Sequence, residues 1–155
     1  SLSNITNKNV TFKKENAYAM SFHNDHVDTV IGSSILHHLE IKKAIKEIYR
    51  VLKPNGYMVF TEPNMMNPQI ALQKNIPYIK RKMGDSPDET AFFRWRLNKL
   101  LVKNGFKEIE ILPFDFLHPS IPATLIKIIS KIGYAVEQIP VMKEISGSLF
   151  IKCKK

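Results

Sequence analysis

The pattern of apolar and polar residues changes its period along the chain and predicts strands that alternate with helices. Val27–Gly32 is a β-branched run between polar clusters, which is typical of a buried central strand. From Glu40 to Leu52 apolar residues recur every three or four positions, and this spacing predicts an amphipathic helix. Lys53–Gly56 ends that helix, because proline cannot continue it and Asn-Gly tolerates the positive φ of a tight return. Tyr57–Thr61 follows as a second buried strand.

This order of strand, helix and strand predicts two parallel neighbours joined by a right-handed crossover, and therefore an α/β layer fold. The other expected elements are a short strand over Asn9–Lys13, a helix over Glu89–Lys103, a half-exposed strand over Phe106–Leu112, a helix that Ser120 caps and Gly133 ends, and a terminal strand over Ser148–Lys154. Residues 65–89 and 114–140 are expected to leave the sheet and cover a substrate, since loops at a sheet edge vary with function. No repeat or Ser/Gly linker divides the chain, so 1–155 is interpreted as one domain.

The composition is that of a globular domain, with 155 residues, 44% of them hydrophobic and 24% charged. No apolar run approaches the roughly 18 residues of a membrane span. Ser1–Val10 lacks the basic and apolar regions of a secretion signal. Cys153 is the single cysteine, which rules out an internal disulfide and favours a reducing cytoplasm as the location.

Lysine and arginine outnumber aspartate and glutamate by 23 to 14, which gives a net charge of +9 and raises the question of an anionic partner. The basic residues are scattered singly along the predicted helices, with one dense cluster at Lys80–Lys82. No aromatic residues interleave with them as on an RNA-binding surface. Nucleic-acid binding is therefore not the expected main function, and a solvated surface explains the Lys80–Lys82 cluster better than an anionic acceptor.

Three segments follow predicted strands at what should be the carboxyl edge of the sheet, where ligands of open α/β sheets bind. They are Glu15–Ala17, Gly32–Ser34 and Glu62–Asn64. Gly32 would let a ligand approach the backbone, and the serine hydroxyls and the Asn16 amide could hydrogen-bond a polar small molecule. The alternative is that Ser33 and Asn64 only cap or turn the chain.

Three linked runs carry a resemblance to a known family: Glu15–Phe22, Val27–Leu39 and Glu47–Gly56. In this order they resemble class I S-adenosylmethionine-dependent methyltransferases, most closely the small-molecule branch of the methyltransferase type 11 kind, which includes quinone methyltransferases. The likeness continues through the strand after Gly56, the Asn104–Phe106 helix end and Ser146–Phe150, so it covers nearly the whole chain.

The resemblance implies a Rossmann-like three-layer α/β/α sheet of seven strands, the last of them antiparallel, with S-adenosylmethionine across its carboxyl edge. It assigns adenine recognition to the side chain of Asn16 and the backbone N–H of Ala17, and the methionine end to the main chain of Ser33 and Ser34. Asn16 stands where the family usually has aspartate. Its amide oxygen can still accept a hydrogen bond from the adenine amino group.

One family feature is missing from the chain. The first strand, the glycine-rich loop with its helix and the second strand with a ribose-binding acid should all precede Ser1, and the six glycines never form a G-x-G. We therefore expect an N-terminally truncated, incomplete catalytic domain, whose 155-residue form binds the cofactor weakly or not at all.

Methyl transfer from a sulfonium needs alignment of the nucleophile and exclusion of water, so few catalytic residues are expected. If an acceptor hydroxyl or amine loses a proton, His37 or His38 is the best-placed base, although a helix-entry or packing role is the alternative. With His23 and His26 these histidines also suggest a metal. No cysteine lies nearby and no pair has helical i, i+4 spacing, so no metal site is expected.

Two function hypotheses remain open. In the first, the chain is a methyltransferase for a small-molecule acceptor, and apolar residues could cover the substrate unless they are ordinary core: Met65, Met66, Phe92, Phe93 and Trp95. In the second, it is a non-catalytic relative whose strand 27–32 is an exposed edge that pairs with a second copy or another partner.

Overall fold

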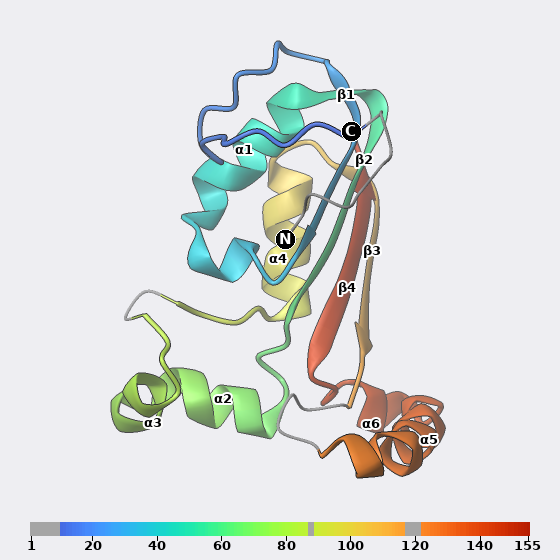
Figure 1. Ribbon diagram of the computed structural model, residues 1–155. Coiled ribbons are helices and arrows are strands. Elements are labelled where there is room, and N and C mark those ends of the chain that lie inside the picture. Colours follow the sequence, from blue (N-terminus) through green and yellow to red (C-terminus); the bar gives the residue numbers. More distant parts are fainter. Residues whose placement is uncertain (1–9, 87–88, 117–121) are drawn as a thin grey trace.

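The computed structural model describes residues 10–86, 89–116 and 122–155, in which a four-stranded mixed sheet carries helices on one face and at one end (Figure 1). The strands are β1 (Val27–Ser33), β2 (Leu52–Pro63), β3 (Lys107–Phe114) and β4 (Ser148–Lys154), in the order β1-β2-β4-β3. The α-helices are α1 (Ile41–Val51), α2 (Pro68–Asn75), α3 (Pro77–Lys82), α4 (Arg94–Lys103), α5 (Ile126–Glu137) and α6 (Pro140–Lys143), and the 3-10 helices are η2 (Leu36–His38) and η3 (Ala123–Leu125).

The topology confirms the predicted crossover and the antiparallel last strand. β1 and β2 are parallel neighbours, with Val30 opposite Met58 and Ser33 opposite Thr61. β4 runs antiparallel to both β2 and β3, so β3 is parallel to β2. The carboxyl ends of β1, β2 and β3 therefore lie at one edge of the sheet, from which the chain enters η2, α2 and η3.

Helix α1 forms where the apolar spacing predicted it and buries its stripe against the sheet. Ala44, Ile45, Ile48 and Val51 are buried, while its lysines face solvent. The helix ends at Val51, and β2 begins at once rather than at Tyr57, because Leu52 already pairs with Val27. Asn55 adopts a positive φ of 66°, as the Asn-Gly sequence predicts.

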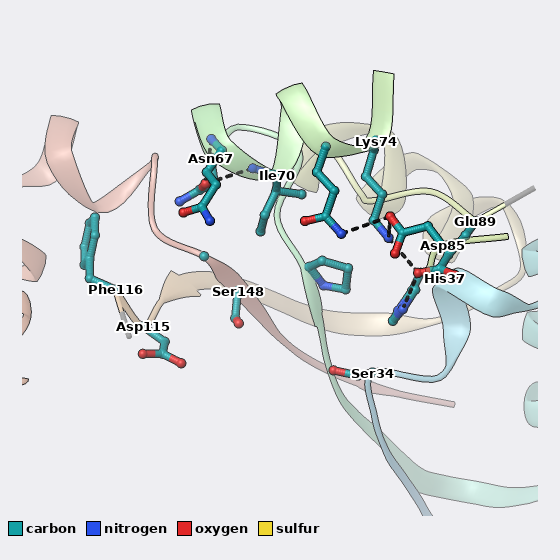
Figure 2. Close-up of a pocket in the computed structure, with 14 residues that line it drawn as sticks. Ser34, His37, Asn67, Ile70, Lys74, Asp85, Glu89, Asp115, Phe116 and Ser148 are labelled. Carbon is teal, nitrogen blue, oxygen red and sulfur yellow. Dashed lines mark hydrogen bonds and ion pairs between the residues drawn. The ribbon is translucent and has the colours of Figure 1, made fainter. Parts of the chain in front are cut away.

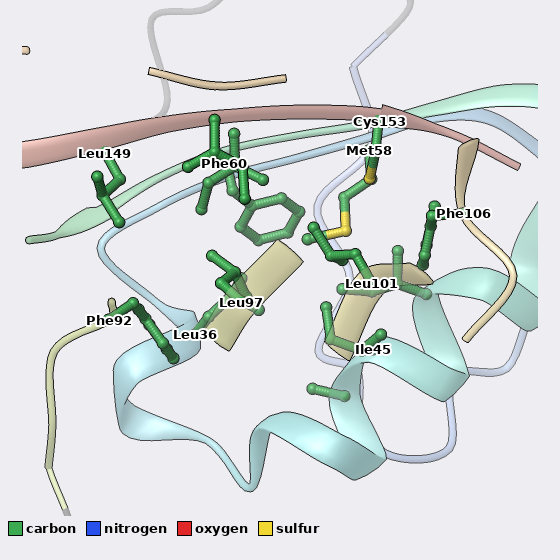
Figure 3. Packing of buried hydrophobic residues seen from close by; sticks show 14 of the residues in the cluster. Leu36, Ile45, Met58, Phe60, Phe92, Leu97, Leu101, Phe106, Leu149 and Cys153 are labelled. Carbon is green, nitrogen blue, oxygen red and sulfur yellow. The ribbon is translucent and has the colours of Figure 1, made fainter. Parts of the chain in front are cut away.

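Helix α4 packs beside α1 on the same face of the sheet, and the hydrophobic core lies between them and the strands (Figures 1 and 3). It begins at Arg94 rather than at Glu89, because Phe93 is an extended N-cap residue and Phe92 forms a bridge with Asn64. Gly105, with a φ of 93°, follows its C-terminus as predicted. The core contains Leu36, Ile45, Met58, Phe60, Leu97, Leu101, Phe106, Leu149, Ile151 and Cys153.

Two predictions at the start of the sheet are wrong. The described residues 10–13 form no strand, and Val10 and Phe12 are exposed, because alternation over so few residues is a weak signal without a partner strand. β1 is not a central strand within the described sheet. It pairs with β2 alone, and Ile31 on it is 76% exposed.

The two excursions are more helical than their sequences predict. Residues 65–89 contain α2 and α3, each of which begins at a proline, and no apolar residue of either helix is buried. α5 does not end at Gly133 but continues to Glu137. Gly133 is its buried residue, where a Cβ atom would lie 3.3 Å from the Cβ of Phe116, so this glycine serves packing rather than termination. The predicted cap Ser120 lies outside the described residues.

Candidate active site at the carboxyl edge

The chain leaves β1 through two serines that are tied to the neighbouring strand. The hydroxyl groups of Ser33 and Thr61 lie 2.8 Å apart, and the N–H of Ser34 donates to the carbonyl oxygen of Thr61 at 2.8 Å. Ser34 has a φ of 49°, a left-handed conformation that turns the chain out of the sheet. Both serines are exposed at the carboxyl edge, where the predicted cofactor contacts would be made.

The first turn after these serines is held by the buried carboxylate of Glu62, at the end of β2. It accepts hydrogen bonds from the N–H groups of Ile35, Leu36 and His37 at 3.0, 2.7 and 3.3 Å. Its Oε2 also lies 2.8 Å from Nδ1 of His37. A neutral His37 that donates from Nδ1 to this carboxylate keeps Nε2 as a hydrogen-bond acceptor.

A second charged group meets His37 from the other side and joins it to α2. Nε2 of His37 lies 3.7 Å from Oε1 of Glu89, and Nδ1 of His38 lies 3.3 Å from Oε2 of the same carboxylate. The ammonium of Lys74 lies 2.6 Å from Glu89 and 2.8 Å from Asp85 (Figure 2). Except for His38, which is 47% exposed, these side chains are almost completely buried. Together they form a continuous ionic network.

Burial and pairing act in opposite directions on these groups. Burial disfavours the ionised form of Asp85 and Glu89, but the hydrogen bonds from Lys74 outweigh it and hold the pKa of each carboxyl below its ordinary value. Burial likewise disfavours the ammonium of Lys74, whose pKa is nevertheless raised by its hydrogen bonds to Asp85 and Glu89. The three groups are therefore charged at neutral pH.

A cavity of about 380 Å³ opens beside this network, between the sheet edge and α2 (Figure 2). Ser34, His37 and Pro63 form its sheet side, while both excursions contribute to the rest of its wall. The residues from the excursions are Asn67, Gln69, Ile70, Gln73, Lys74, Asp85, Glu89, Asp115 and Phe116. The wall is thus polar and charged near His37 and apolar at Ile70 and Phe116.

The predicted adenine-binding segment around Asn16 lies outside the 380 Å³ cavity, near the start of α1. Asn16 accepts a hydrogen bond from the N–H of Tyr18 at 2.9 Å, and the Tyr18 hydroxyl accepts one from the N–H of Glu40 at 2.9 Å. Tyr18 and His38 line a second depression, at the start of α1. Asn16, Ala17 and Ser33 do not line the 380 Å³ cavity. His37 faces that cavity, and its neighbour His38 faces the depression near Asn16.

Two residues that the sequence suggested for ligand contact are explained by packing. A Cβ atom on Gly32 would lie 2.2 Å from the Phe60 ring, so this glycine makes room for its partner strand. The amide of Asn64 is buried and donates to the carbonyl oxygens of Glu144 and Ser146, both at 2.9 Å. The Asn64 Oδ1 also accepts from the N–H of Met66 at 3.0 Å, so the alternative that Asn64 turns the chain is correct.

The structure separates the four histidines considered as metal ligands into two pairs. The rings of His23 and His26 lie 6.3 Å apart, and those of His37 and His38 4.0 Å apart. His37, His38 and Glu89 each bring one possible ligand atom within 4.8 Å of the others. However, Lys74 already supplies a positive charge 2.6 Å from Glu89, so the cluster is an ion-paired network with its own cation.

The apolar residues considered as a substrate cover are divided between core and surface. Met65, Phe92 and Phe93 line a cavity of about 200 Å³ against α4, and Phe92 also belongs to the core cluster. Trp95 is half-exposed, with its ring 5.0 Å from that of Phe93. Phe92 therefore has the core role that the sequence left open.

Sequence reasoning missed the network around His37. Glu62 could have been noticed as a carboxylate at the end of a buried strand, a position that faces a following helix turn. Lys74 and Asp85 gave no signal, because nothing in the local sequence brings them to a histidine some 40 residues earlier. Only the docking of α2 places them there.

This fold is that of the class I S-adenosylmethionine-dependent methyltransferases, which confirms the resemblance found in the sequence. The family model described as methyltransferase domain matches residues 2–60. That range includes the segments around Asn16, Ser33 and His37, so the family signal coincides with the region of the candidate site.

The related proteins agree on this class. An uncharacterised methyltransferase-like protein of Schizosaccharomyces pombe is 29% identical over 108 residues, which are 70% of this chain and 41% of that protein. Among solved structures, an S-adenosylmethionine-dependent methyltransferase of Thermotoga maritima, described as a possible histamine N-methyltransferase, matches with a TM-score of 0.69 and 20% identity over 94% of this chain and 64% of its own. Phosphoethanolamine N-methyltransferase 2 of Haemonchus contortus, solved with S-adenosylmethionine, matches with a TM-score of 0.55 and 14% identity. The match covers 90% of this chain and 36% of that protein's chain.

The chain thus spans less than two thirds of the length of these relatives. Within the described residues, none of the helices is long and apolar enough to cross a membrane.

Proposed function

We propose that this chain forms the carboxyl-edge part of a methyltransferase site that transfers a methyl group from S-adenosylmethionine to a small molecule. The observation that carries the proposal is the position of Ser34 and His37, which follow β1, and of Pro63, which ends the parallel strand β2, on one side of a 380 Å³ cavity in a methyltransferase fold. Ligands of open α/β sheets bind at this edge.

The residues proposed to hold the cofactor are Asn16, Ala17, Ser33 and Ser34. The turn at Tyr18 uses one lone pair of the Asn16 amide oxygen and leaves a second for the adenine amino group. The left-handed conformation of Ser34 turns the main chain outward at the sheet edge, where the methionine end would lie. When bound, S-adenosylmethionine supplies a methyl group already activated by its sulfonium.

His37 is the proposed general base for an acceptor hydroxyl or amine. His37 lines the cavity, and the Glu62 carboxylate at Nδ1 fixes the ring, which leaves Nε2 to accept the proton. Glu62 is thus a positioning residue. His38, which is more exposed and has Nδ1 3.3 Å from the Glu89 carboxylate, is the alternative base at the depression near Tyr18.

The two excursions are proposed to select the acceptor, because nine of the residues that line the cavity belong to them. The wall combines carboxylates, amides and one ammonium with Ile70 and Phe116, which suits a polar acceptor carrying a small apolar part. The two structural relatives are described as N-methyltransferases of amines, one of them as a possible one, so amines come first in a search.

The test is a methyl-transfer assay with the full-length protein, using S-adenosylmethionine labelled in its methyl group and a panel of small amines and hydroxyl compounds. His37→Asn should lower kcat about 10²- to 10⁴-fold, with KM for the cofactor little changed. His23→Asn, at an exposed position away from the cavity, is the matched control. Transfer by His37→Asn at the rate of the control would refute the role of His37, and absence of transfer to every compound would refute the proposed activity.

A second candidate function is binding through the outer edge of β1. Within the described residues β1 has one partner strand, and Ile31 on it is 76% exposed. In this case the chain would dimerise or bind a partner strand without catalysis. Light scattering separates the two, because a dimer that Ile31→Lys converts to a monomer supports the binding function, whereas a monomer at all concentrations excludes the dimer.

A further inference from the structure

Helix α5 presents an apolar surface to solvent beside a row of lysines. Ile128 and Ile132, one turn apart, are 60% and 57% exposed. Lys127 and Lys131 precede each of them by one position and are also exposed, so a basic row runs alongside the apolar row. An amphipathic helix of this kind, with apolar residues flanked by lysines, is suited to lie in the interface of a membrane.

The other excursion repeats this combination at the same end of the molecule (Figure 1). In α3 and just after it, Tyr78 and Met83 are exposed beside Arg81 and Lys82. Exposed tyrosines stand on both sides, since Tyr134 of α5 is 70% and Tyr78 is 69% exposed. Tyrosine combines an apolar ring with a polar hydroxyl and is enriched where membrane and water meet.

The two excursions are joined by hydrogen bonds, so their surfaces keep a fixed relation. The amide of Asn67, which caps α2, donates to the carbonyl oxygen of Ile145 after α6 at 2.9 Å. The buried amide of Asn64 donates to the carbonyl oxygen of Glu144 at 2.9 Å. The 380 Å³ cavity lies between the two excursions.

The charged side chains that are exposed at this end are basic among the residues that the structure describes. The acidic residues described there, Asp85, Glu89, Asp115, Glu137 and Glu144, are buried or half-buried. Asp85 and Glu89 pair with Lys74, Glu144 pairs with Arg94, and Glu137 accepts from the N–H of Asp115. The exposed basic side chains of α3 and α5 therefore dominate its outer surface.

We propose that the end of the molecule formed by α2–α3 and α5–α6 docks on the surface of an anionic phospholipid bilayer. The exposed lysines and arginine face the headgroups, while Ile128, Ile132 and Tyr78 enter the interface between headgroups and acyl chains. A second copy of the chain is a poorer occupant, because a symmetric contact would bring like charges together. Docking would turn the cavity between the excursions toward the membrane, and it does not depend on the proposed chemistry.

The test is co-sedimentation of the full-length protein with vesicles of phosphatidylcholine containing about a third phosphatidylglycerol, and with vesicles of phosphatidylcholine alone. The protein should sediment with the anionic vesicles, and added salt should release it. Lys127→Gln/Lys131→Gln should weaken binding by about tenfold or more, since each lysine near an anionic surface contributes roughly fivefold. Ile128→Gln/Ile132→Gln should weaken it by a similar factor and leave the salt dependence unchanged.

Val102→Gln/Lys103→Gln on α4 is the matched control, since it removes an exposed apolar side chain and a lysine elsewhere on the molecule. All variants lie at exposed positions, and equal melting temperatures confirm that they fold. The proposal is overturned if the protein does not sediment with anionic vesicles, or if the control loses as much binding as the α5 variants. It is also overturned if light scattering shows a dimer that the α5 variants dissociate.

Discussion

At the scale of single residues, Glu62 determines how the chain passes from β1 into η2. Its carboxylate is buried at the end of β2 and accepts from three consecutive backbone N–H groups and from the ring of His37. A charged acceptor satisfies four donors that would otherwise be buried without partners. The strand end, the turn and His37 therefore form one unit.

Replacing this carboxylate by an amide tests that view. Glu62→Gln keeps one acceptor oxygen but turns an NH₂ group toward N–H donors, so we expect the free energy of unfolding to fall by about 1–3 kcal/mol. Urea denaturation measures the change. Glu40→Gln, which removes an exposed pair with Lys43, should cost no more than about 0.5 kcal/mol. Equal losses in the two variants would contradict the role given to Glu62.

The network around Lys74 makes a prediction about pH. Because the folded-state pKa values of Asp85 and Glu89 lie below their ordinary values, the stabilisation they give is complete above roughly pH 4–5 and is lost as the pH falls through the folded-state values. Lys74→Met leaves two nearly buried carboxylates without their cation, and should lower the free energy of unfolding at about pH 7 by roughly 3–5 kcal/mol.

The same substitution should also reduce the loss of stability on acidification, because protonation then relieves an unpaired buried charge. Urea denaturation at about pH 7 and about pH 3 measures both effects. Lys53→Met, which breaks a pair with the exposed Asp28, is the control and should change stability little at either pH. An acid loss in Lys74→Met as large as in the unaltered protein would be inconsistent with the network.

At the scale of elements, local periodicity predicted the strands and helices that pack an apolar face against the core. α1, β1, β2 and β4 each present an apolar face to one core, and a face of this kind repeats at a period that can be recognised in sequence. α2 and α3 escaped prediction because they bury no apolar residue and so have no apolar stripe to detect. The β-branched residues of β1 are equally compatible with a central and an edge strand, so its edge position was expected only in the hypothesis of a non-catalytic relative with an exposed strand 27–32.

The packing of β1 on β2 depends on the absence of a side chain at Gly32. Gly32→Ala would place a Cβ atom 2.2 Å from the Phe60 ring on the partner strand, and should lower the free energy of unfolding by about 1–3 kcal/mol. Phe60→Leu alone also destabilises, because it empties part of the core. In the double variant the two losses should be less than additive, as a double-mutant cycle by urea denaturation can measure. Additive losses would show that the ring and the glycine are not in contact as described.

At the scale of the whole molecule, one core joins the sheet to α1 and α4, and the site lies at its edge (Figures 1 and 3). Four residues of the site could be predicted because they directly follow the predicted strand 27–32: Ser33, Ser34, His37 and His38. Their partners Lys74, Asp85 and Glu89 come from an excursion whose docking depends on tertiary contacts. The sequence could therefore indicate where a site lies but not what surrounds it.

The single cysteine reports on the integrity of this core. Cys153 is fully buried in β4, and burial raises the pKa of its thiol to about 12. Because the thiolate is the reactive form, an alkylating reagent at about pH 8 should label the folded protein only through unfolding. In denaturant, where the pKa is about 8.5, labelling should be faster by several orders of magnitude. Mass spectrometry measures the rates, and equal rates in both states would contradict a closed core.

The central claim is that the carboxyl edge of β1 and β2 binds S-adenosylmethionine with its methyl group toward the cavity beside His37. The most direct measurement is the change in backbone amide NMR signals of the full-length protein when S-adenosylhomocysteine is added to saturation. Shifts concentrated at Ala17, Ser33 and Ser34, with smaller ones at His37 and His38, are the result we expect. Saturation without a change at these amides, or shifts confined to another part of the molecule, would contradict the claim.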